Sequence, residues 1–325
     1  MRERTERVVT WVCHPDDLDP AHVPRIEAQM AERWAGPAAE AGFVFRFIPA
    51  NQLVPGCVGG RPVLWHHGED LLRRRHCYIV DDVSPNPQAA QFLRGIYRVI
   101  DASDSVLLNR ALVGPECLER DKLAILSRAA TLGIRVPPTL VIPFGRYARA
   151  GLEAIRAQLG DGPYIVKPRE SGVGYGVLRL DTYEQLRSVA DMVAAAGQSF
   201  IVQPYLPNAG DLRVAIVQGR VVTSMLRRPS EGAYLSNITQ GGVSTARPDP
   251  TPVLDDSLLI ARDLRAEYLC VDWLLTPDGP VLGEWGTAMA EFSPFPEPSR
   301  SELARAFFAW ADDTLRQERS QPAWT

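Results

Sequence analysis

Residues 1–109 alternate short apolar segments with longer segments of helical periodicity, and this alternation limits the folds open to the chain. The apolar segments have the length of strands, and the longer segments between them are amphipathic. The predicted strands are 7–13, 43–48, 77–82 and 105–109, and the predicted helices are 22–41 and 86–100. Because strands joined through helices can run parallel, we expect a small, mostly parallel sheet.

The middle of the chain predicts a compact α+β unit. The predicted helices are about 118–132, 149–159 and 182–196, and the predicted strands are 139–143, 163–170 and 176–180. Thr182 and Gln185 have the spacing of a capping box at the start of the third helix. Helices and strands are therefore mixed between residues 118 and 196.

From residue 199 the pattern changes to strands joined by tight turns. Gln218-Gly219 and Asp278-Gly279 are turn pairs between strand segments, so the strands that they join are expected to be antiparallel. One helix, at about 255–267, interrupts the strands. The predicted strands are 199–206, 211–219, 220–228, 270–276 and 280–285.

A terminal helix follows a proline-rich linker. Ser299 and Glu302 have the spacing of a capping box at its start, and Leu303, Phe307 and Trp310 share one face of it. The sequence as a whole predicts an α/β and α+β fold in three units, 1–114, 115–198 and 199–325.

Composition excludes several classes of protein. The formal net charge is −4 and no run of 18 apolar residues occurs, so we expect neither nucleic acid nor a membrane as a partner. The first residues lack the apolar stretch of a secretion signal, and five scattered cysteines form no C-x-x-C pair. Both features favour a cytoplasmic protein with reduced thiols. His66, His67 and His76 lie close in sequence but give little support to a metal site without a cysteine pair.

The basic residues are unusual. Of 35 basic residues, 33 are Arg, and the only lysines are Lys122 and Lys167. Coding bias explains an excess of Arg. The two retained lysines could also mark places where a compact ammonium group is needed in place of a planar guanidinium.

A glycine-bearing turn follows the second lysine. Lys167 precedes Ser171, Gly172, Gly174 and Gly176. Glycines at alternate positions let backbone N–H groups approach phosphate oxygens closely, and the lysine adds a point charge. The pattern matches neither a P-loop nor a dinucleotide fingerprint, and a hairpin with flexible glycines is the alternative.

Asp272 and Glu284 are isolated carboxylates within apolar strand segments. They flank the Asp278-Gly279 turn, which places them on neighbouring strands. A buried carboxylate needs a cation or strong donors, and two such oxygen ligands suit Mg²⁺ held against nucleotide phosphates. A structural salt bridge with an arginine is the alternative.

A third group of residues is mainly basic and contains Asp211, Arg213, Arg227, Arg228 and Asn237. Arg213 alternates with apolar residues on one predicted strand, and Arg227 lies on the next. Two guanidinium groups on one face could stabilise the charge of a transferring phosphoryl group. The alternative is that they are solvated surface arginines.

The order of these motifs along residues 115–292 resembles the ATP-grasp superfamily, and most closely its RimK-like and glutathione-synthetase-like carboxylate–amine ligases. The strongest stretch is 215–242, AIVQGRVVTSMLRRPSEGAYLSNITQGG, which fits the family's pattern without a gap. The resemblance implies an ATP-grasp fold, with residues 1–114 as a domain that precedes it.

The resemblance also implies roles for the nucleotide-binding residues. Lys122 and Lys167 match the two lysines that hold the α- and β-phosphates of ATP. The turn Ser171–Gly176 matches the mobile loop over the triphosphate, and Asp211 is grouped with the nucleotide-binding residues. The hinge that contacts adenine through backbone groups corresponds to Gln203, Pro204, Tyr205 and Leu206.

The remaining roles concern the reaction. Arg213 and Arg227 match arginines near the γ-phosphate and the acyl phosphate, and Asn237 matches a polar residue beside them. Asp272 and Glu284 match ligands of Mg²⁺. ATP and Mg²⁺ are thus the implied cofactors.

The sequence departs from the family pattern at two places. The family's metal strand usually has E-x-N, whereas Glu284 is followed by Trp285 and Gly286. The RimK pattern has arginines before S-N and G-G, where this chain has Leu235 and Gln240. These differences favour a less anionic substrate than a ribosomal protein tail.

The sequence therefore predicts an ATP-dependent ligase that joins small amino acids into a dipeptide or γ-glutamyl-type product through an acyl phosphate. A ligase that modifies a peptide or protein, and a non-catalytic ATP-binding module, are the alternatives. The donor, the amine and the oligomeric state are left open.

Overall fold

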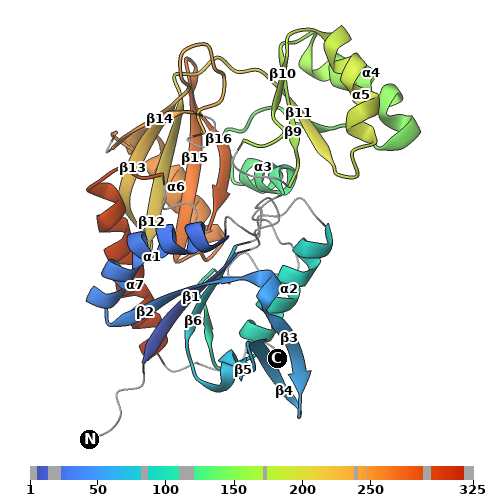
Figure 1. Cartoon of the computed structure of the whole chain (residues 1–325). Coiled ribbons are helices and arrows are strands. Elements are labelled where there is room, and N and C mark those ends of the chain that lie inside the picture. The colour runs from blue at the N-terminus through green and yellow to red at the C-terminus, as the bar shows by residue number, and fades with distance from the viewer. Residues whose placement is uncertain are drawn as a thin grey trace, which may run out of the picture.

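The computed structural model describes residues 6–13, 23–81, 87–109, 121–170, 174–237, 241–246, 248–287 and 294–317. Figure 1 shows three regions: a parallel sheet with α1 and α2, a small sheet with α4 and α5, and a larger antiparallel sheet. Within the described residues, no helix is long and apolar enough to cross a bilayer.

The N-terminal sheet has the order β2-β1-β6-β7, and all its neighbouring strands are parallel, as predicted. Its elements are β1 (Arg7–Cys13), α1 (Val23–Glu40), β2 (Phe43–Pro49), β6 (Cys77–Val80), α2 (Pro87–Asp101) and β7 (Val106–Leu107). A second, antiparallel sheet of β3 (Val54–Val58), β4 (Arg61–His66) and β5 (Glu69–Asp70) was not predicted. Pro55 interrupts β3, Pro62 interrupts β4 and β5 has only two residues, so these strands lack a clear strand pattern.

The middle sheet has the order β10-β9-β11-β8. Its strands are β8 (Leu140–Val141), β9 (Tyr164–Pro168), β10 (Leu178–Leu180) and β11 (Phe200–Pro204), and its helices are α3 (Lys122–Thr131), α4 (Ala148–Leu159) and α5 (Tyr183–Ala194). The capping box of Thr182 and Gln185 is confirmed. Helix α3 begins later than predicted because the Asp121 carboxylate caps it, accepting from the N–H groups of Leu123 and Ala124.

The C-terminal sheet has the order β14-β13-β12-β15-β16 and is antiparallel, as the turn pairs predicted. Its strands are β12 (Asp211–Val217), β13 (Arg220–Arg228), β14 (Val243–Ala246), β15 (Tyr268–Thr276) and β16 (Gly279–Gly286), and its helices are α6 (Leu254–Asp263) and α7 (Ser299–Arg316). Single 3-10 turns lie at Ala50–Gln52, Leu71–Arg73, Gly145–Tyr147 and Thr251–Val253.

The predicted cap of the terminal helix is wrong. Pro298 occupies the N-cap position, and Ser299 lies inside the first turn with a buried hydroxyl that has no partner among the described residues. The Glu297 carboxylate instead accepts from the backbone N–H and the hydroxyl of Ser301, at 3.2 and 2.7 Å. The acidic group that stabilises this helix start therefore precedes the helix.

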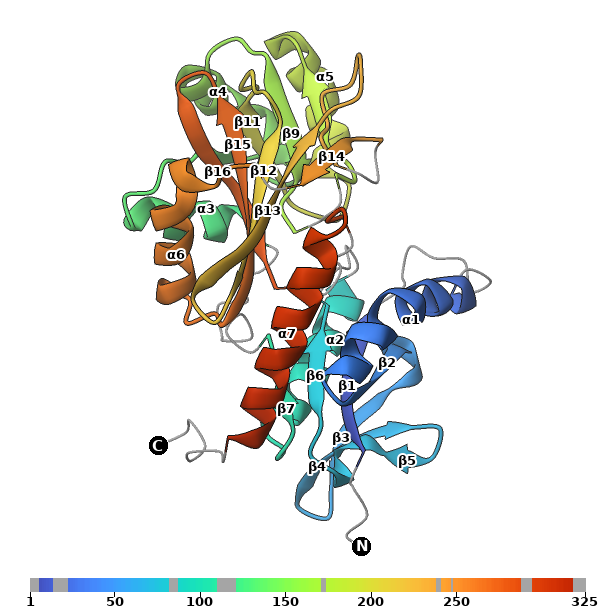
Figure 2. The same cartoon turned by 90° about the vertical axis from the view of Figure 1, so that its left-hand side faces the viewer.

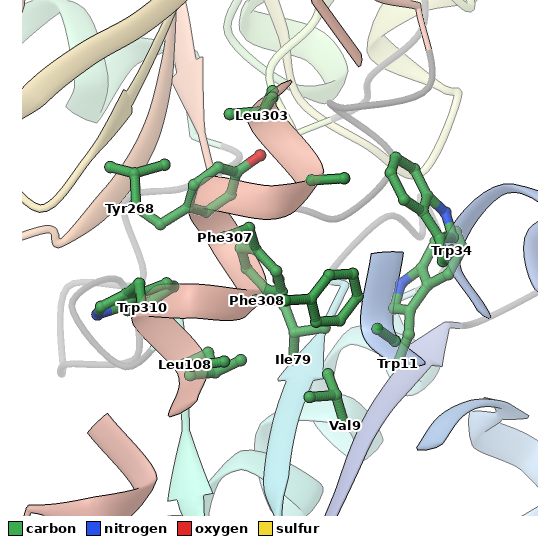
Figure 3. Packing of buried hydrophobic residues seen from close by; sticks show 14 of the residues in the cluster. Val9, Trp11, Trp34, Ile79, Leu108, Tyr268, Leu303, Phe307, Phe308 and Trp310 are labelled. Atoms are coloured by element: carbon green, nitrogen blue, oxygen red, sulfur yellow. The ribbon is translucent and has the colours of Figure 1, made fainter. Parts of the chain in front are cut away.

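Helix α7 packs against both the first and the last sheet (Figure 2). Its Phe307 and Phe308 are buried in one cluster with Trp11 and Trp34 from the N-terminal region and Tyr268 from β15 (Figure 3). This core contains residues of the first and third predicted units. The division of the chain at residues 115 and 199 remains a prediction. The described cysteines, Cys13, Cys57, Cys77 and Cys270, are not in disulfide bonds.

Candidate active site

One cavity lies between the four-stranded sheet of β9 and β11 and the five-stranded sheet of β12, β13, β15 and β16. Most of the predicted site residues line it: Lys122, Lys167, Gly174, Gln203, Pro204, Tyr205, Leu206, Asp211, Arg227, Asn237, Asp272 and Glu284. Arg213 contacts this group through Asp272, and Gly176 adjoins it. Ser171 and Gly172 lie outside the described residues.

The two lysines meet at this cavity from different elements. Lys122 is the first residue of α3, and its N–H donates to the carbonyl of Arg169 at 3.0 Å. The Arg169 guanidinium in turn binds Asp121 at 2.6 and 2.5 Å, which fixes the start of α3 against the end of β9. Lys167 lies on β9.

The charge around Lys167 favours an anionic ligand. Burial and the neighbouring Lys122 ammonium lower the pKa of Lys167 to about 8, against the opposing effect of Glu284. Two ammonium groups held near each other in a partly desolvated cavity repel, and a polyphosphate between them would remove that repulsion. The two lysines therefore fit the phosphate-binding role that the sequence predicted.

This pKa predicts how nucleotide binding should depend on pH. An anion binds the ammonium form of Lys167, which is lost as the pH rises through about 8. We expect the Kd for ADP, measured by calorimetry, to rise roughly twentyfold from about pH 7.5 to about pH 9.5. The effect of pH on folding stability has the opposite sign. Between pH 8 and 10.5 the unfolded chain binds more protons at Lys167 than the folded chain does, so the free energy of unfolding increases as the pH rises. A Kd that is constant over this range would contradict the assignment.

The glycine turn needs its glycines for conformational reasons. Gly174 and Gly176 have φ values of 75° and 69°. A Cβ on Gly176 would lie 2.8 Å from Cγ of Pro168, so no larger residue fits there without a shift of β9. A turn with these constraints places Gly174, Tyr175 and Val177 on the cavity that Lys167 also lines.

Two of the four hinge residues, Gln203 and Tyr205, have side chains in contact with other groups of the protein. The Gln203 amide donates to the hydroxyl of Thr139 at 2.8 Å. The Arg179 guanidinium lies 4.3 Å from the ring centre of Tyr205, and the Tyr205 N–H donates to the carbonyl of Pro163. Recognition of a base here would therefore depend on backbone groups of Pro204 and Leu206, as the family resemblance implies.

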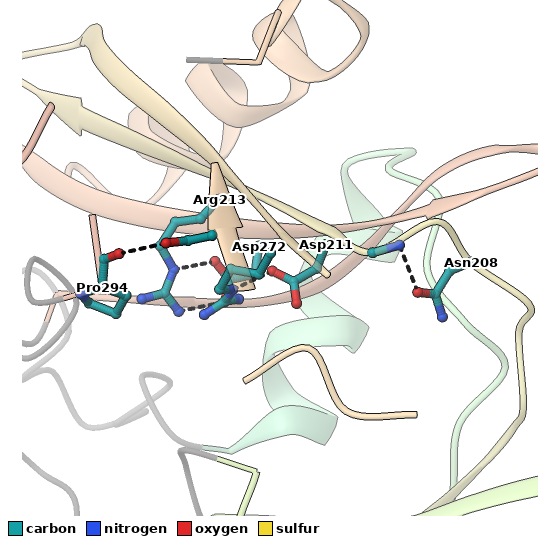
Figure 4. A network of polar contacts seen from close by, with 8 residues as sticks. Asn208, Asp211, Arg213, Asp272 and Pro294 are labelled. Carbon is teal, nitrogen blue, oxygen red and sulfur yellow. Dashed lines mark hydrogen bonds and ion pairs between the residues drawn. The ribbon is translucent and has the colours of Figure 1, made fainter. Parts of the chain in front are cut away.

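A buried network of four charged groups lies at the other wall (Figure 4). The Asp272 carboxylate accepts from Nε and Nη2 of Arg213, at 2.7 and 2.6 Å, and from Nη2 of Arg227 at 2.7 Å. Nε of Arg227 donates to Asp211 at 2.5 Å. Both arginines are only 5% exposed, so the alternative that they are solvated surface groups is wrong.

This network determines the protonation of its acids. Burial alone would raise the pKa of Asp272, but Arg213 and Arg227 overcome this effect and lower it to about 2. Burial, opposed by Arg227, raises the pKa of Asp211. Asp272 is thus firmly ionised, and the salt bridge considered for it from the sequence is present.

The predicted metal ligands lie directly opposite each other. Asp272 on β15 pairs with Glu284 on β16. Two carboxylates beside a phosphate-binding cavity suit Mg²⁺, which often takes only one or two protein carboxylates together with substrate phosphates. Because guanidinium groups already hold Asp272, a bound cation would share that carboxylate with them. The described residues contain no group of three His, Cys, Asp or Glu side chains with metal-binding geometry.

Comparison with known proteins identifies the family. A model of the RimK-like ATP-grasp domain matches residues 119–288, which is more than half of the chain. The chain belongs to the RimK-like ATP-grasp family. The resemblance noted from the order of the motifs is thereby confirmed.

Its relatives by sequence are named as ligases. A probable alpha-L-glutamate ligase of Trichodesmium erythraeum is 29% identical over 190 residues, which cover 57% of this chain and 59% of that protein. A probable alpha-L-glutamate ligase of Syntrophotalea carbinolica is 28% identical over 234 residues, covering 69% and 72%.

Solved structures confirm the ATP-grasp fold over nearly the whole chain. The D-cycloserine synthetase DcsG has a TM-score of 0.69 at 16% identity, and the comparison covers 95% of this chain and 100% of that one. D-alanyl-alanine synthetase A from Vibrio cholerae O1 has a TM-score of 0.69 at 13% identity, with 96% and 99% covered. The ATP-grasp ligase PsnB with its minimal precursor has a TM-score of 0.61 at 15% identity, with 95% and 99% covered.

Sequence reasoning missed one connection in this RimK-like protein. The Tyr234 hydroxyl donates to the carbonyl of Val177 at 2.9 Å and so joins the loop of Ser236 and Asn237 to the glycine turn. Gly242 supports the same loop, since a Cβ there would clash with the Ser236 carbonyl oxygen. The S-N and G-G spacing was visible in the sequence, but a tyrosine that spans two loops has no sequence pattern.

Proposed function

We propose that this protein is an ATP-dependent carboxylate–amine ligase that joins two small amino acids through an acyl phosphate. One observation carries the proposal: a single cavity is bordered by two ammonium groups, a buried arginine–aspartate network and the opposed carboxylates of Asp272 and Glu284. Membership of the RimK-like ATP-grasp family supports it.

The first chemical step would be phosphoryl transfer to a carboxylate. The donor's carboxylate oxygen forms a bond to the γ-phosphorus, the bond to the bridging oxygen breaks, and ADP leaves. Lys122 and Lys167 would hold the α- and β-phosphates, while Arg227 offers positive charge at the opposite wall. Mg²⁺ held by Asp272 and Glu284 would neutralise phosphate charge.

The second step would form the amide. The amine nitrogen bonds to the acyl carbon, the carbon–oxygen bond to phosphate breaks, and the nitrogen loses a proton. An acyl phosphate hydrolyses readily, so water must be kept out while it exists. The contact of Tyr234 with Val177 would help by joining the loops on two sides of the cavity.

The lining of the cavity favours a small substrate of low charge. Leu235 lies on the cavity where the RimK pattern has an arginine, and Leu274 also lines it. Neither can bind a second carboxylate of an acidic acceptor. An amino acid without a charged side chain therefore fits this wall better than a glutamate tail.

A peptide substrate is the second candidate. PsnB and MdnC, the latter a macrocyclase of Microcystis aeruginosa, have similar folds and are described in complex with precursor peptides. In that case the donor carboxylate would belong to a peptide side chain.

A screen of amino-acid pairs tests the proposal. The purified protein is incubated with ATP, Mg²⁺ and all pairs of free amino acids, and phosphate release and product mass are measured. We expect ADP, phosphate and a dipeptide mass for at least one pair, and no phosphate release without amino acids. Phosphate release only with an added peptide would favour the second candidate, and nucleotide binding with no turnover in either case would favour a binding module.

A further inference from the structure

A second cavity lies in the N-terminal region, between the parallel sheet and the segment of β4 and β5. In Figure 1 these strands lie at the end of the molecule opposite β9 and β11. None of the residues that line it belongs to the candidate active site. It is therefore separate from the cavity of the candidate active site, which is called the nucleotide cavity below.

The floor of this cavity is a row of polar side chains across three strands. Thr10 on β1 is in register with Arg46 on β2 and with Tyr78 on β6. Their neighbours two residues along, Val12 and Ile48, are buried in the hydrophobic core of this sheet face. A threonine that is 2% exposed and an arginine are thus placed where the strands otherwise carry apolar residues.

The walls add further positive charge. Arg73 ends the 3-10 turn Leu71–Arg73 and lines the cavity together with Arg74 and His76. Trp65 of β4 lines it from the other sheet. The side chains of Arg73 and Arg74 make no hydrogen bond or ion pair with the rest of the described chain. These residues belong to the run RRRH at 73–76, which the proposed ligase function does not use.

The acids nearby do not balance this charge. The Asp70 carboxylate already has partners within the protein. It accepts from Nη1 of Arg61 at 2.6 Å and from the N–H groups of Leu64 and Leu72 at 3.1 and 3.2 Å. Among the described residues, Arg46 has only a 3.5 Å ion pair with the exposed Glu6, and Glu69 is exposed at the rim.

The titration of the histidine agrees with an excess of positive charge. Burial, Arg46 and Arg74 lower the pKa of His76, and the opposing effects of Glu6 and Glu69 are smaller. Burial, His67 and Arg46 likewise lower the pKa of the nearby His66, against the effect of Glu69. The electrostatic potential in the cavity therefore favours an anion over a cation.

We propose that this cavity binds a small organic or inorganic anion that carries carboxylate or phosphate groups. Arg46 and the Thr10 hydroxyl form the floor of the site, and Arg73 and Arg74 close over the ligand from the rim. Guanidinium groups bind both carboxylates and phosphates through paired N–H donors, so the two chemistries are distinguished by experiment. The proposal does not depend on the ligase reaction.

Binding is measured by calorimetry at constant ionic strength, with inorganic phosphate and citrate as the two probes. We expect saturable binding of at least one probe to the wild-type protein. In the double variant Arg46→Gln/Arg74→Gln its Kd should rise about tenfold or more. The matched control Arg98→Gln removes an exposed arginine of α2 that does not line the cavity and should bind as the wild type does.

Two further variants distinguish loss of this site from misfolding and from binding at the other cavity. Arg74→Gln alone changes an exposed residue and should weaken binding without affecting the fold. Lys167→Met removes a phosphate-binding group of the nucleotide cavity and should leave the probe's Kd unchanged. The proposal is overturned if neither probe binds, if Arg46→Gln/Arg74→Gln binds as the wild type does, or if Lys167→Met abolishes the binding. Binding of phosphate alone or citrate alone would identify the chemistry of the ligand.

Discussion

The variant Lys167→Met is expected to lose ATP-dependent turnover by about a hundredfold or more while its thermal stability is unchanged or higher. The loss follows because no other ammonium group except Lys122 lines the described part of the cavity. The stability follows from the pKa of about 8, which shows that the folded protein disfavours the charged form of Lys167. Phosphate release and a thermal melt measure the two effects.

Two variants make this result specific. Arg187→Met removes an exposed cation of α5 and should have wild-type turnover. Lys167→Arg keeps the charge but replaces a compact ammonium by a planar fork, and we expect it to recover only part of the activity. Wild-type turnover in Lys167→Met would exclude Lys167 from the active site. Full activity in Lys167→Arg would show that this position does not require a compact ammonium group.

The fold was predictable where a local pattern and the tertiary structure agree. The capping box at Thr182 and the turn pair Gln218-Gly219 depend on neighbouring residues only, and Gln218 and Gly219 indeed have φ values of 49° and 69°. Strands β3 to β5 were missed because they carry no apolar alternation. The cap of α7 was missed because Glu297, outside the helix, replaces the predicted Ser299.

The sequence was enough to predict which residues line the candidate site, but not which contacts they make with one another. The order of motifs brought Arg213, Arg227 and Asp272 to one face, and the register of β12 with β15 pairs Arg213 with Asp272. Whether a guanidinium or a metal ion holds that carboxylate depends on side-chain geometry, which strand patterns do not contain. The anion cavity was not predicted for the same reason, since Arg46 and Arg74 are far apart in the sequence.

Removing the carboxylate at the centre of the network should have the largest effect on stability. Asp272→Asn leaves Arg213 and Arg227 buried beside each other without their shared anion. Breaking a buried pair in this way costs about 3–5 kcal/mol. We expect the free energy of unfolding, measured with urea and without nucleotide or Mg²⁺, to fall by that amount.

The matched control is a similar pair in solvent. Nε and Nη2 of Arg128 bind the two carboxylate oxygens of Asp263 at 2.8 and 2.9 Å, but the Arg128 side chain is 43% exposed. Asp263→Asn should therefore cost less than about 1 kcal/mol. Equal losses in Asp272→Asn and Asp263→Asn would show that water reaches the network.

The same variant tests Asp272 as a metal ligand. If Asp272 binds Mg²⁺, the ion should raise the melting temperature of the ADP-bound wild type but not of ADP-bound Asp272→Asn. The reason is that the variant lacks the anionic oxygen that both the arginines and the metal require.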